Sequence, residues 1–226
     1  MATDLPTRFD STLDLARLPW FEVRGGNRLV VADDARQELG PVIDAHTHLA
    51  MGFVRKLRVD LHAETPTTAY YLPLTLPVDL DAYSNTNLDA AALFAMKADV
   101  SVLGLTGFGM RTTHTAPNLL REMGALGIEQ SVVLPFDLPV GARNADHLLE
   151  VVGRYPELVP FGSVHPFDRD ADVRPDRQQA AGARGVKLHP NGQFIAPDHP
   201  RTVHLCGRCG DRGLPVLFHC GPVGIE

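Results

Sequence analysis

The sequence is poor in cysteine, with only Cys206, Cys209 and Cys220 among its 226 residues. An odd number of cysteines in one short stretch is not the disulfide framework of a small secreted protein. The scarcity favours a reducing compartment, and we predict a cytoplasmic protein. Cys206 and Cys209 form a single Cys-x-x-Cys pair, for which packing is a stronger interpretation than zinc binding. Cys220 is expected in the core.

The sequence also lacks a long apolar run and an excess of positive charge. No run approaches the ~18–20 apolar residues that cross a bilayer. The first residues, Met-Ala-Thr-Asp-Leu-Pro, show no basic-then-apolar signal pattern. A net charge of -6 argues against nucleic acid or an anionic membrane as the main partner. The expected partner is a small-molecule substrate, and self-association into a homo-oligomer stays open.

The chain is long and apolar enough for one globular domain, because 44% of its residues are hydrophobic. Residues 1–40 are predicted to be a lead-in, with two short strands at 21–24 and 28–31 around a Gly-Gly-Asn turn. Residues 41–226 are predicted to form a partial barrel domain. An insertion or cap interrupts it at about 52–113, with an Ala-rich helix at 88–97.

After the insertion, apolar strands alternate with helical patterns, which is typical of a parallel sheet covered by helices. Such units build either a doubly wound sheet or a barrel, and no Gly-x-Gly-x-x-Gly follows the first strand, which disfavours dinucleotide binding. The predicted strands are 42–48, 129–135, 159–165, 185–189 and 214–219, and the predicted helices are 118–126, 145–154, 172–183 and 201–213.

Polar side chains gather where the predicted strands end. In parallel barrels the active site is built at the carboxyl ends of the strands, because every strand-to-helix loop opens there. These predicted ends carry His46, His48, His165, Lys187, His189 and His219.

The first strand carries a pair of histidines. Strand side chains alternate, so Asp44, His46 and His48 face one side and two imidazoles there can bind one divalent ion, with Asp44 in support. Ten histidines in 226 residues give roughly 0.4 His-x-His pairs by chance, so the pair alone is weak evidence for a metal site. A structural role and a metal-binding role are about equally supported by this motif alone.

The later strands offer further candidates with structural alternatives. A lone His219 at a strand end is more often structural, but it becomes a third nitrogen ligand if the pair binds metal. Lys187 and His189 share one strand face at the same rim. Lys187 either pairs with a carboxylate or acts in the site, where burial would lower the pKa of its amine.

Taken in order, three motifs resemble those of the amidohydrolase superfamily, and in particular its amidohydrolase-related (Amidohydro_2-type) TIM-barrel hydrolases. They are Val42-Ile-Asp-Ala-His-Thr-His48, Arg184-Gly-Val-Lys-Leu-His-Pro190 followed by Gln193, and Gly213-Leu-Pro-Val-Leu-Phe-His-Cys-Gly221. Residues 127–135 and 159–166 resemble the family's second and third strands. The resemblance covers about residues 41–50 and 116–226.

The resemblance implies a metal-dependent hydrolase, in which a metal-activated water would attack the carbonyl carbon of an amide, ester or lactone. His46, His48 and His219 would bind one divalent metal, usually zinc, which lowers the pKa of its water toward ~7. Lys187 and His189 would be the catalytic residues that stabilise the oxyanion. A carboxylated Lys187 would hold a second metal.

The sequence departs from the family at its end. The family's barrel has eight strands, whereas this sequence stops at Glu226, just after the fifth predicted strand. The sixth-strand histidine and the eighth-strand aspartate of the family have no counterpart here. We therefore expect an α/β, TIM-barrel-type fold with about five of eight strands, from a truncated chain. Two alternatives stay open, a metal-dependent decarboxylase of the same superfamily and a non-catalytic fragment.

Overall fold

Two parallel three-stranded sheets form the centre of the protein. The computed structural model describes residues 5–52, 58–82, 84–101, 108–138, 141 and 143–220. The first sheet has the order β4-β6-β7 and the second the order β10-β9-β8. The strands are β4 (Val42–Thr47), β6 (Ile128–Val133), β7 (Leu158–Pro160), β8 (Gly162–Ser163), β9 (Val186–Leu188) and β10 (Val216–Phe218).

A single residue joins the two sheets. Phe161 separates β7 from β8, and its N–H donates to the carbonyl of Val133 in the first sheet. The next N–H, that of Gly162, donates to Gly185 at the start of the second sheet. Five parallel strand segments therefore neighbour one another in chain order. This order is that of a barrel and not of a doubly wound sheet, in which the strand order reverses.

The core lies between these strands and the helices that follow them. One cluster of buried side chains joins Val133 and Leu158 of the first sheet to Met123, Leu148 and Val152 of the helices. A second joins Val186 and Leu188 to Leu205, Cys209 and Leu214. Buried apolar residues on both sides of a strand are what a helix-covered parallel sheet requires.

The predicted helices are present, with ends that differ by a few residues. Gly127 follows α3 with a φ of 68°, the left-handed conformation for which glycine is favoured as a helix stop. A short helix after β9 was not predicted. The helices of the barrel part are α3 (Ala116–Leu126), α4 (Asn144–Val152), α5 (Arg174–Ala180), α6 (Pro190–Gln193) and α7 (Pro200–Gly210).

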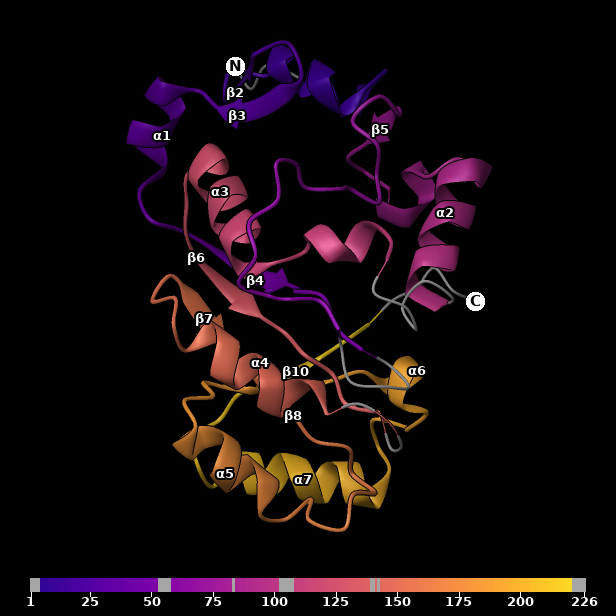
Figure 1. Ribbon diagram of the computed structural model, residues 1–226, viewed down its shortest axis with the longest axis vertical. Helices are drawn as coiled ribbons and strands as arrows, with labels where there is room; N and C mark the ends of the chain where they lie inside the picture. The colour runs from indigo at the N-terminus through magenta and orange to yellow at the C-terminus, as the bar shows by residue number, and fades with distance from the viewer. Residues whose placement is uncertain are drawn as a thin grey trace.

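The lead-in and the insertion lie together at one end of the molecule (Figure 1). The predicted hairpin is present as β2 (Phe21–Arg24) and β3 (Arg28–Val31), paired antiparallel. β1 (Arg8–Phe9) pairs with β5 (Val78–Asp79), which joins the lead-in to the insertion. The remaining elements here are η1 (Thr12–Arg17), α1 (Asp33–Leu39), η2 (Ser84–Asn87), α2 (Ala90–Ser101), which covers much of the predicted helix, and η4 (Met110–Thr113).

The three cysteines are free thiols. Cys209 is buried in the second core cluster and Cys206 packs against it, which agrees with the packing interpretation of this pair. The prediction for Cys220 was wrong, because this residue is exposed. β10 ends at Phe218, so the strand alternation on which the prediction relied does not reach Cys220. Within the described residues, no helix combines the length and apolar character that a membrane crossing requires.

Candidate metal and catalytic site

The side chains at the carboxyl ends of β4, β9 and β10 lie close enough to shift one another's pKa values. Burial is the largest cause that lowers the pKa of His46, and the charges of Lys187 and His219 lower it further. Lys187 and His189 likewise lower the pKa of His48. The fold thus brings five side chains from three strand ends close enough for their charges to interact, as the strand positions predict.

His46 and His48 approach each other through the same ring atom. Their Nε2 atoms are 3.1 Å apart and their ring centroids 5.0 Å apart. The Nδ1 atom of His48 lies 2.6 Å from the carbonyl oxygen of Leu134. A carbonyl only accepts, so Nδ1 carries the proton and the neutral ring presents an unprotonated Nε2.

This pair fits a divalent metal ion. Two nitrogen ligands of a tetrahedral zinc, each at ~2.0–2.1 Å, lie about 3.3 Å from each other, close to the observed separation. A backbone carbonyl that holds Nδ1–H is also the usual outer contact of a metal-binding histidine. The two Nε2 atoms are therefore spaced as two nitrogen ligands of one divalent ion would be.

The pKa of His48 is lowered to about 4. The ring keeps solvent-accessible surface, yet many protein atoms surround it, and this partial removal from water is the largest cause. The charge of His46 acts in the same direction, while the hydrogen bond to Leu134 opposes it. His48 is consequently an uncharged nitrogen donor at neutral pH.

Asp44 lies on the same strand but does not bind an imidazole in the described structure. Its Oδ1 accepts the backbone N–H of His46 at 2.9 Å, at a place where the register between β4 and β6 shifts. Its charge opposes the lowering of the His46 pKa. Asp44 therefore shapes the strand around His46 and adds a nearby negative charge.

His189 and His219 form a second pair. Their rings stack with centroids 4.0 Å apart and an angle of 7° between their planes. The Nδ1 atom of His189 accepts the N–H of Gly192 at 3.0 Å, so the proton of the neutral ring is on Nε2. Burial, followed by the charges of His219 and Lys187, lowers the pKa of His189 to about 4. His189 is thus a neutral ring with one N–H available at Nε2.

The two pairs do not merge into a larger ligand set. Among the residues that the structure describes, no three or more His, Cys, Asp or Glu side chains are placed to hold one metal ion. His46 and His48 are brought together as the sequence predicts, while His219 lies against His189. The three-histidine set stays a prediction.

Lys187 is completely buried, with 0% of its surface exposed. Its Nζ atom has no hydrogen-bond partner within the described part of the chain, and none of the ion pairs there includes it. Burial lowers the pKa of Lys187 to about 8, and the charge of Cys220 opposes this. The structural alternative, a lysine paired with a carboxylate, is not what these residues form.

The other strand-end histidine, His165, has a structural role. Its Nε2 atom donates to the carbonyl of Gln193 at 2.9 Å, and its Nδ1 atom accepts the N–H of Phe167 at 3.2 Å. The ring is buried and both nitrogens are used. His165 supports the turn that carries His189.

Three residues position His189: Gln193, which the sequence analysis quoted in a motif without a role, and Phe136 and Asp137, which it did not single out. The side chain of Gln193 accepts the N–H of His189 at 2.8 Å and donates to the carbonyl of Asp137 at 2.8 Å. The ring of Phe136 lies 4.9 Å from that of His189. The signal for Phe136 and Asp137 was their place directly after the second strand, where loops of a barrel meet the site.

A comparison with protein families shows to which family the chain belongs. The model of the amidohydrolase family Amidohydro_2 matches residues 43–226. The chain belongs to this family. The match begins one residue into β4 and includes every strand of the two parallel sheets, so the TIM-barrel-like α/β fold is the fold of an amidohydrolase.

Two solved structures are similar to this chain. A probable 2-pyrone-4,6-dicarboxylic acid hydrolase from Acinetobacter baumannii, with citric acid bound, is 14% identical with a TM-score of 0.43, over 80% of this chain and 50% of that one. Metarhizium anisopliae IDCase in its apo form is 16% identical with a TM-score of 0.41, over 80% and 51%. The chain thus spans about half the length of these structures. No curated protein matches its sequence.

Proposed function

We propose that this amidohydrolase is a metal-dependent hydrolase that uses water to cleave an amide, ester or lactone bond of a small molecule. The observation that carries the proposal is the 3.1 Å separation of the His46 and His48 Nε2 atoms, with the His48 Nδ1–H held by Leu134. Zinc is the ion that suits two imidazoles best, and His219 is the proposed third ligand. One ion is proposed, and a second would need a carboxylated Lys187.

A backbone contact orients the ring of His48. Because its Nδ1–H is held by the carbonyl of Leu134, its Nε2 atom lies toward His46. The lowered pKa of His48 keeps this Nε2 atom free of a proton at neutral pH. When bound, a divalent ion supplies Lewis-acid activation of water and polarises a carbonyl oxygen.

Lys187 and His189 would act on the negative charge that develops on the carbonyl oxygen. His189 presents an N–H at Nε2 because Gly192 occupies its Nδ1 atom, so this ring donates and does not accept there. Lys187 brings an amine to a buried position, where a charge is weakly screened by water. Donors that are in place before the reaction stabilise an oxyanion more than water does.

Metal analysis tests the histidine pair directly. The protein, loaded with zinc and desalted, is expected to retain about one ion per chain, and His46→Ala and His48→Ala are expected to lose it, since a two-nitrogen chelate becomes a single ligand. His204→Ala is the matched control, because His204 is exposed and contacts only Asp172 in the described structure. Equal zinc content in all four proteins would exclude the proposed ligands.

A metal-dependent decarboxylase is the second candidate. The observation in its favour is Lys187, a buried amine without a carboxylate partner in the described part of the chain, which suits a substrate carboxylate. Zinc-loaded protein is to be assayed with a panel of esters, amides and lactones, and in parallel for CO₂ release from aromatic and enoic acids. CO₂ release without hydrolysis would replace the first proposal by the second.

A further inference from the structure

A pocket lined by four arginines lies at the opposite end of the strands. It has a volume of about 380 Å³ and is lined by Arg24, Arg28, Val30, Arg36, Arg121, Gly124 and Ala125. α3 ends at Leu126, just before β6 begins, so the pocket is at the amino ends of the strands, whereas His46 and His48 are at the carboxyl ends. The metal site and this pocket are therefore separate places on the fold.

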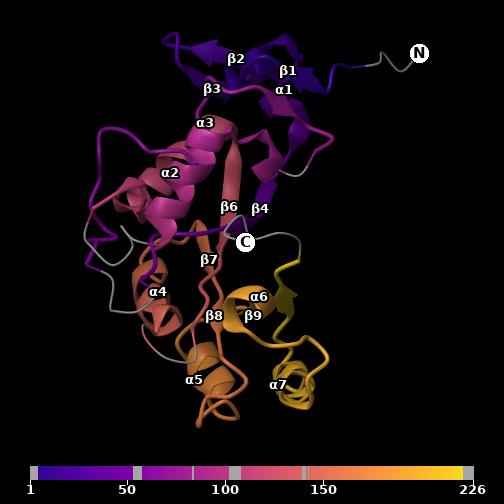
Figure 2. The same cartoon turned by 90° about the vertical axis from the view of Figure 1, so that its right-hand side faces the viewer.

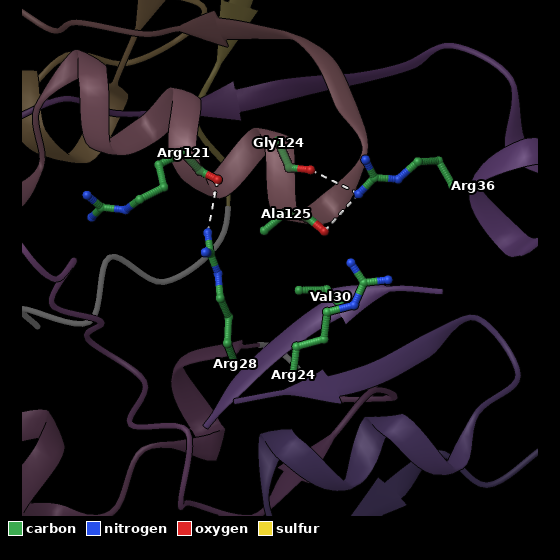
Figure 3. Close-up of a pocket in the computed structure, with 7 residues that line it drawn as sticks. All are labelled: Arg24, Arg28, Val30, Arg36, Arg121, Gly124 and Ala125. Atoms are coloured by element: carbon green, nitrogen blue, oxygen red, sulfur yellow. Dashed lines mark hydrogen bonds between the residues drawn. The ribbon is translucent and has the colours of Figure 1, made fainter. Parts of the chain in front are cut away.

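The arginines reach the pocket from different elements. Figure 3 shows Arg24 and Arg28 extending from the β2–β3 hairpin and Arg36 from α1 toward the last turns of α3, whereas the guanidinium of Arg121, on α3, points away from them and donates to Thr65 and Thr68. Figures 1 and 2 both place the hairpin next to this end of α3. Guanidinium groups that approach from several sides suit a tetrahedral anion better than a flat one.

Two of the arginines are bound to carboxylates that do not line the pocket. Arg24 pairs with Glu22 and with Asp33 at 3.0 Å, and these contacts are exposed. Arg121 lies 3.6 Å from Glu64 and 3.6 Å from Glu122. The lining itself contains no acidic residue among those described.

Arg28 and Arg36 have no carboxylate partner within the described residues. Arg28 donates from Nη2 to the carbonyl of Arg121 at 3.1 Å. Arg36 donates from Nη2 to the carbonyls of Gly124 and Ala125 at 2.9 and 3.1 Å. These contacts suit cations at a helix C-terminus, but they leave Nε and Nη1 of both side chains without a hydrogen bond in the described structure.

We propose that this arginine pocket binds a phosphate or pyrophosphate group of a small molecule. Arg28 and Arg36 bring two positive charges without a described carboxylate partner to one place in a protein whose net charge is -6, so the attraction for an anion is local to these two side chains. Arg28 uses one N–H of its Nη2 atom and keeps one edge with paired N–H donors, while Arg36 keeps the N–H groups of Nε and Nη1 as single donors; both can bind phosphate oxygens. Because the ligand would contact both the hairpin and α3, its binding would stabilise their packing.

Titration calorimetry with sodium phosphate and sodium pyrophosphate tests the proposal on the full chain in EDTA. We expect saturable binding that is absent with sodium chloride at equal ionic strength. Arg28→Gln and Arg36→Gln are each expected to weaken it by about tenfold, since each removes charged hydrogen bonds to the anion. Arg154→Gln is the control, because Arg154 lies exposed just after α4 and pairs with Glu150; this variant should bind phosphate and pyrophosphate as the unchanged protein does.

Two further variants keep the outcome interpretable. If Arg36→Gln loses its fold because α3 loses two contacts at its end, Arg28→Gln alone carries the test. The double variant His46→Ala, His48→Ala should bind pyrophosphate normally, so a failure of the metal proposal is distinguishable from a failure of this one. No saturable binding, or equal binding by Arg28→Gln, would overturn the arginine pocket as a phosphate site.

Discussion

Arg174 and Lys187 are both buried cations near the carboxyl end of the sheets, but only Arg174 has carboxylate partners among the described residues. Arg174 is 2% exposed and donates to Asp137 at 2.8 Å, to Asp146 at 3.2 Å and to Asp168 at 2.9 Å. Burial opposes its charge, but the negative charges of Asp137 and Asp146 outweigh burial and raise the pKa of Arg174. Lys187 is equally buried, yet no described carboxylate contacts it and its pKa falls to about 8.

The difference separates a buried charge that three carboxylates neutralise from one that has no carboxylate partner among the described residues. A buried ion costs several kcal/mol unless partners replace its water, so an unpartnered one lowers stability. Arg174 ties the loops after β6 and β8 to α4 and α5 through its three carboxylates. Lys187 ties nothing together and faces the histidines at the rim. Groups with strongly shifted pKa values cluster at functional sites, which supports a role for Lys187 in the reaction.

The largest expected effect comes from removing the partnered cation. Arg174→Met is expected to lower the free energy of unfolding by about 3–5 kcal/mol, because it leaves Asp137 buried at 1% exposure without its counter-ion. Urea denaturation followed by circular dichroism measures the change. Arg177→Met is the control, because its pair with Asp170 is exposed, and it should cost less than about 1 kcal/mol. A similar small loss in both variants would contradict a structural role for the Arg174 cluster.

Removing Lys187 should increase the free energy of unfolding, whereas removing Arg174 should decrease it. The native pKa of Lys187 is about 8 and the unfolded one about 10.5, so the unfolded chain binds more protons between these values and stability rises with pH there. Below pH 8 the full cost of the buried charge is present, about 3 kcal/mol at 1.36 kcal/mol per pKa unit. Lys187→Met should therefore stabilise the protein at pH 7 by about 2–3 kcal/mol.

This gain should shrink as the pH rises. At pH 10 the remaining difference is expected to be about 1 kcal/mol, because native Lys187 is then neutral in the unchanged protein. Urea denaturation of both proteins at pH 7 and pH 10 measures it, and Lys97→Met, on α2, is a control for the removal of a lysine. A Lys187→Met variant that is less stable at pH 7 would show that Lys187 has a compensating partner.

The smallest effect concerns His189 in acid. Its native pKa is about 4 and its ordinary value 6.5, so the unfolded chain binds more protons between these values and stability falls as the pH falls through this window. At pH 5 this loss is about 2 kcal/mol, again at 1.36 kcal/mol per pKa unit. His189→Asn keeps an acceptor for the Gly192 N–H and should flatten the decline between pH 6.5 and 4, as measured by urea denaturation.

The matched control for this experiment is His204→Asn, at an exposed position on α7. It should follow the acid decline of the unchanged protein. An unaltered decline in His189→Asn would mean that His189 does not resist protonation in the folded state.

The barrel part of the fold was predictable because its signals are local. Neighbouring apolar residues such as Val133 and Leu134, or Val186 and Leu188 on either side of Lys187, are buried as expected of parallel strands covered by helices. Gly127 marks the end of α3 because its backbone adopts a left-handed conformation. Residues 52–113 were less predictable, since β5 has only two residues and pairs with β1 far away in the chain. Such a pair depends on a distant partner and not on local pattern.

The sequence by itself determined the alternation of parallel strands and helices in this amidohydrolase, and with it which end of the strands carries His46, His48, Lys187, His189 and His219. It did so because parallel strands place their carboxyl ends at one rim. Only the tertiary structure decided how those groups are used: Leu134 selects the tautomer of His48, Gly192 selects that of His189, and no described carboxylate reaches Lys187. The contact between His48 and Leu134 joins residues distant in the chain, and the one between His189 and Gly192 depends on the short helix α6 that the sequence did not predict.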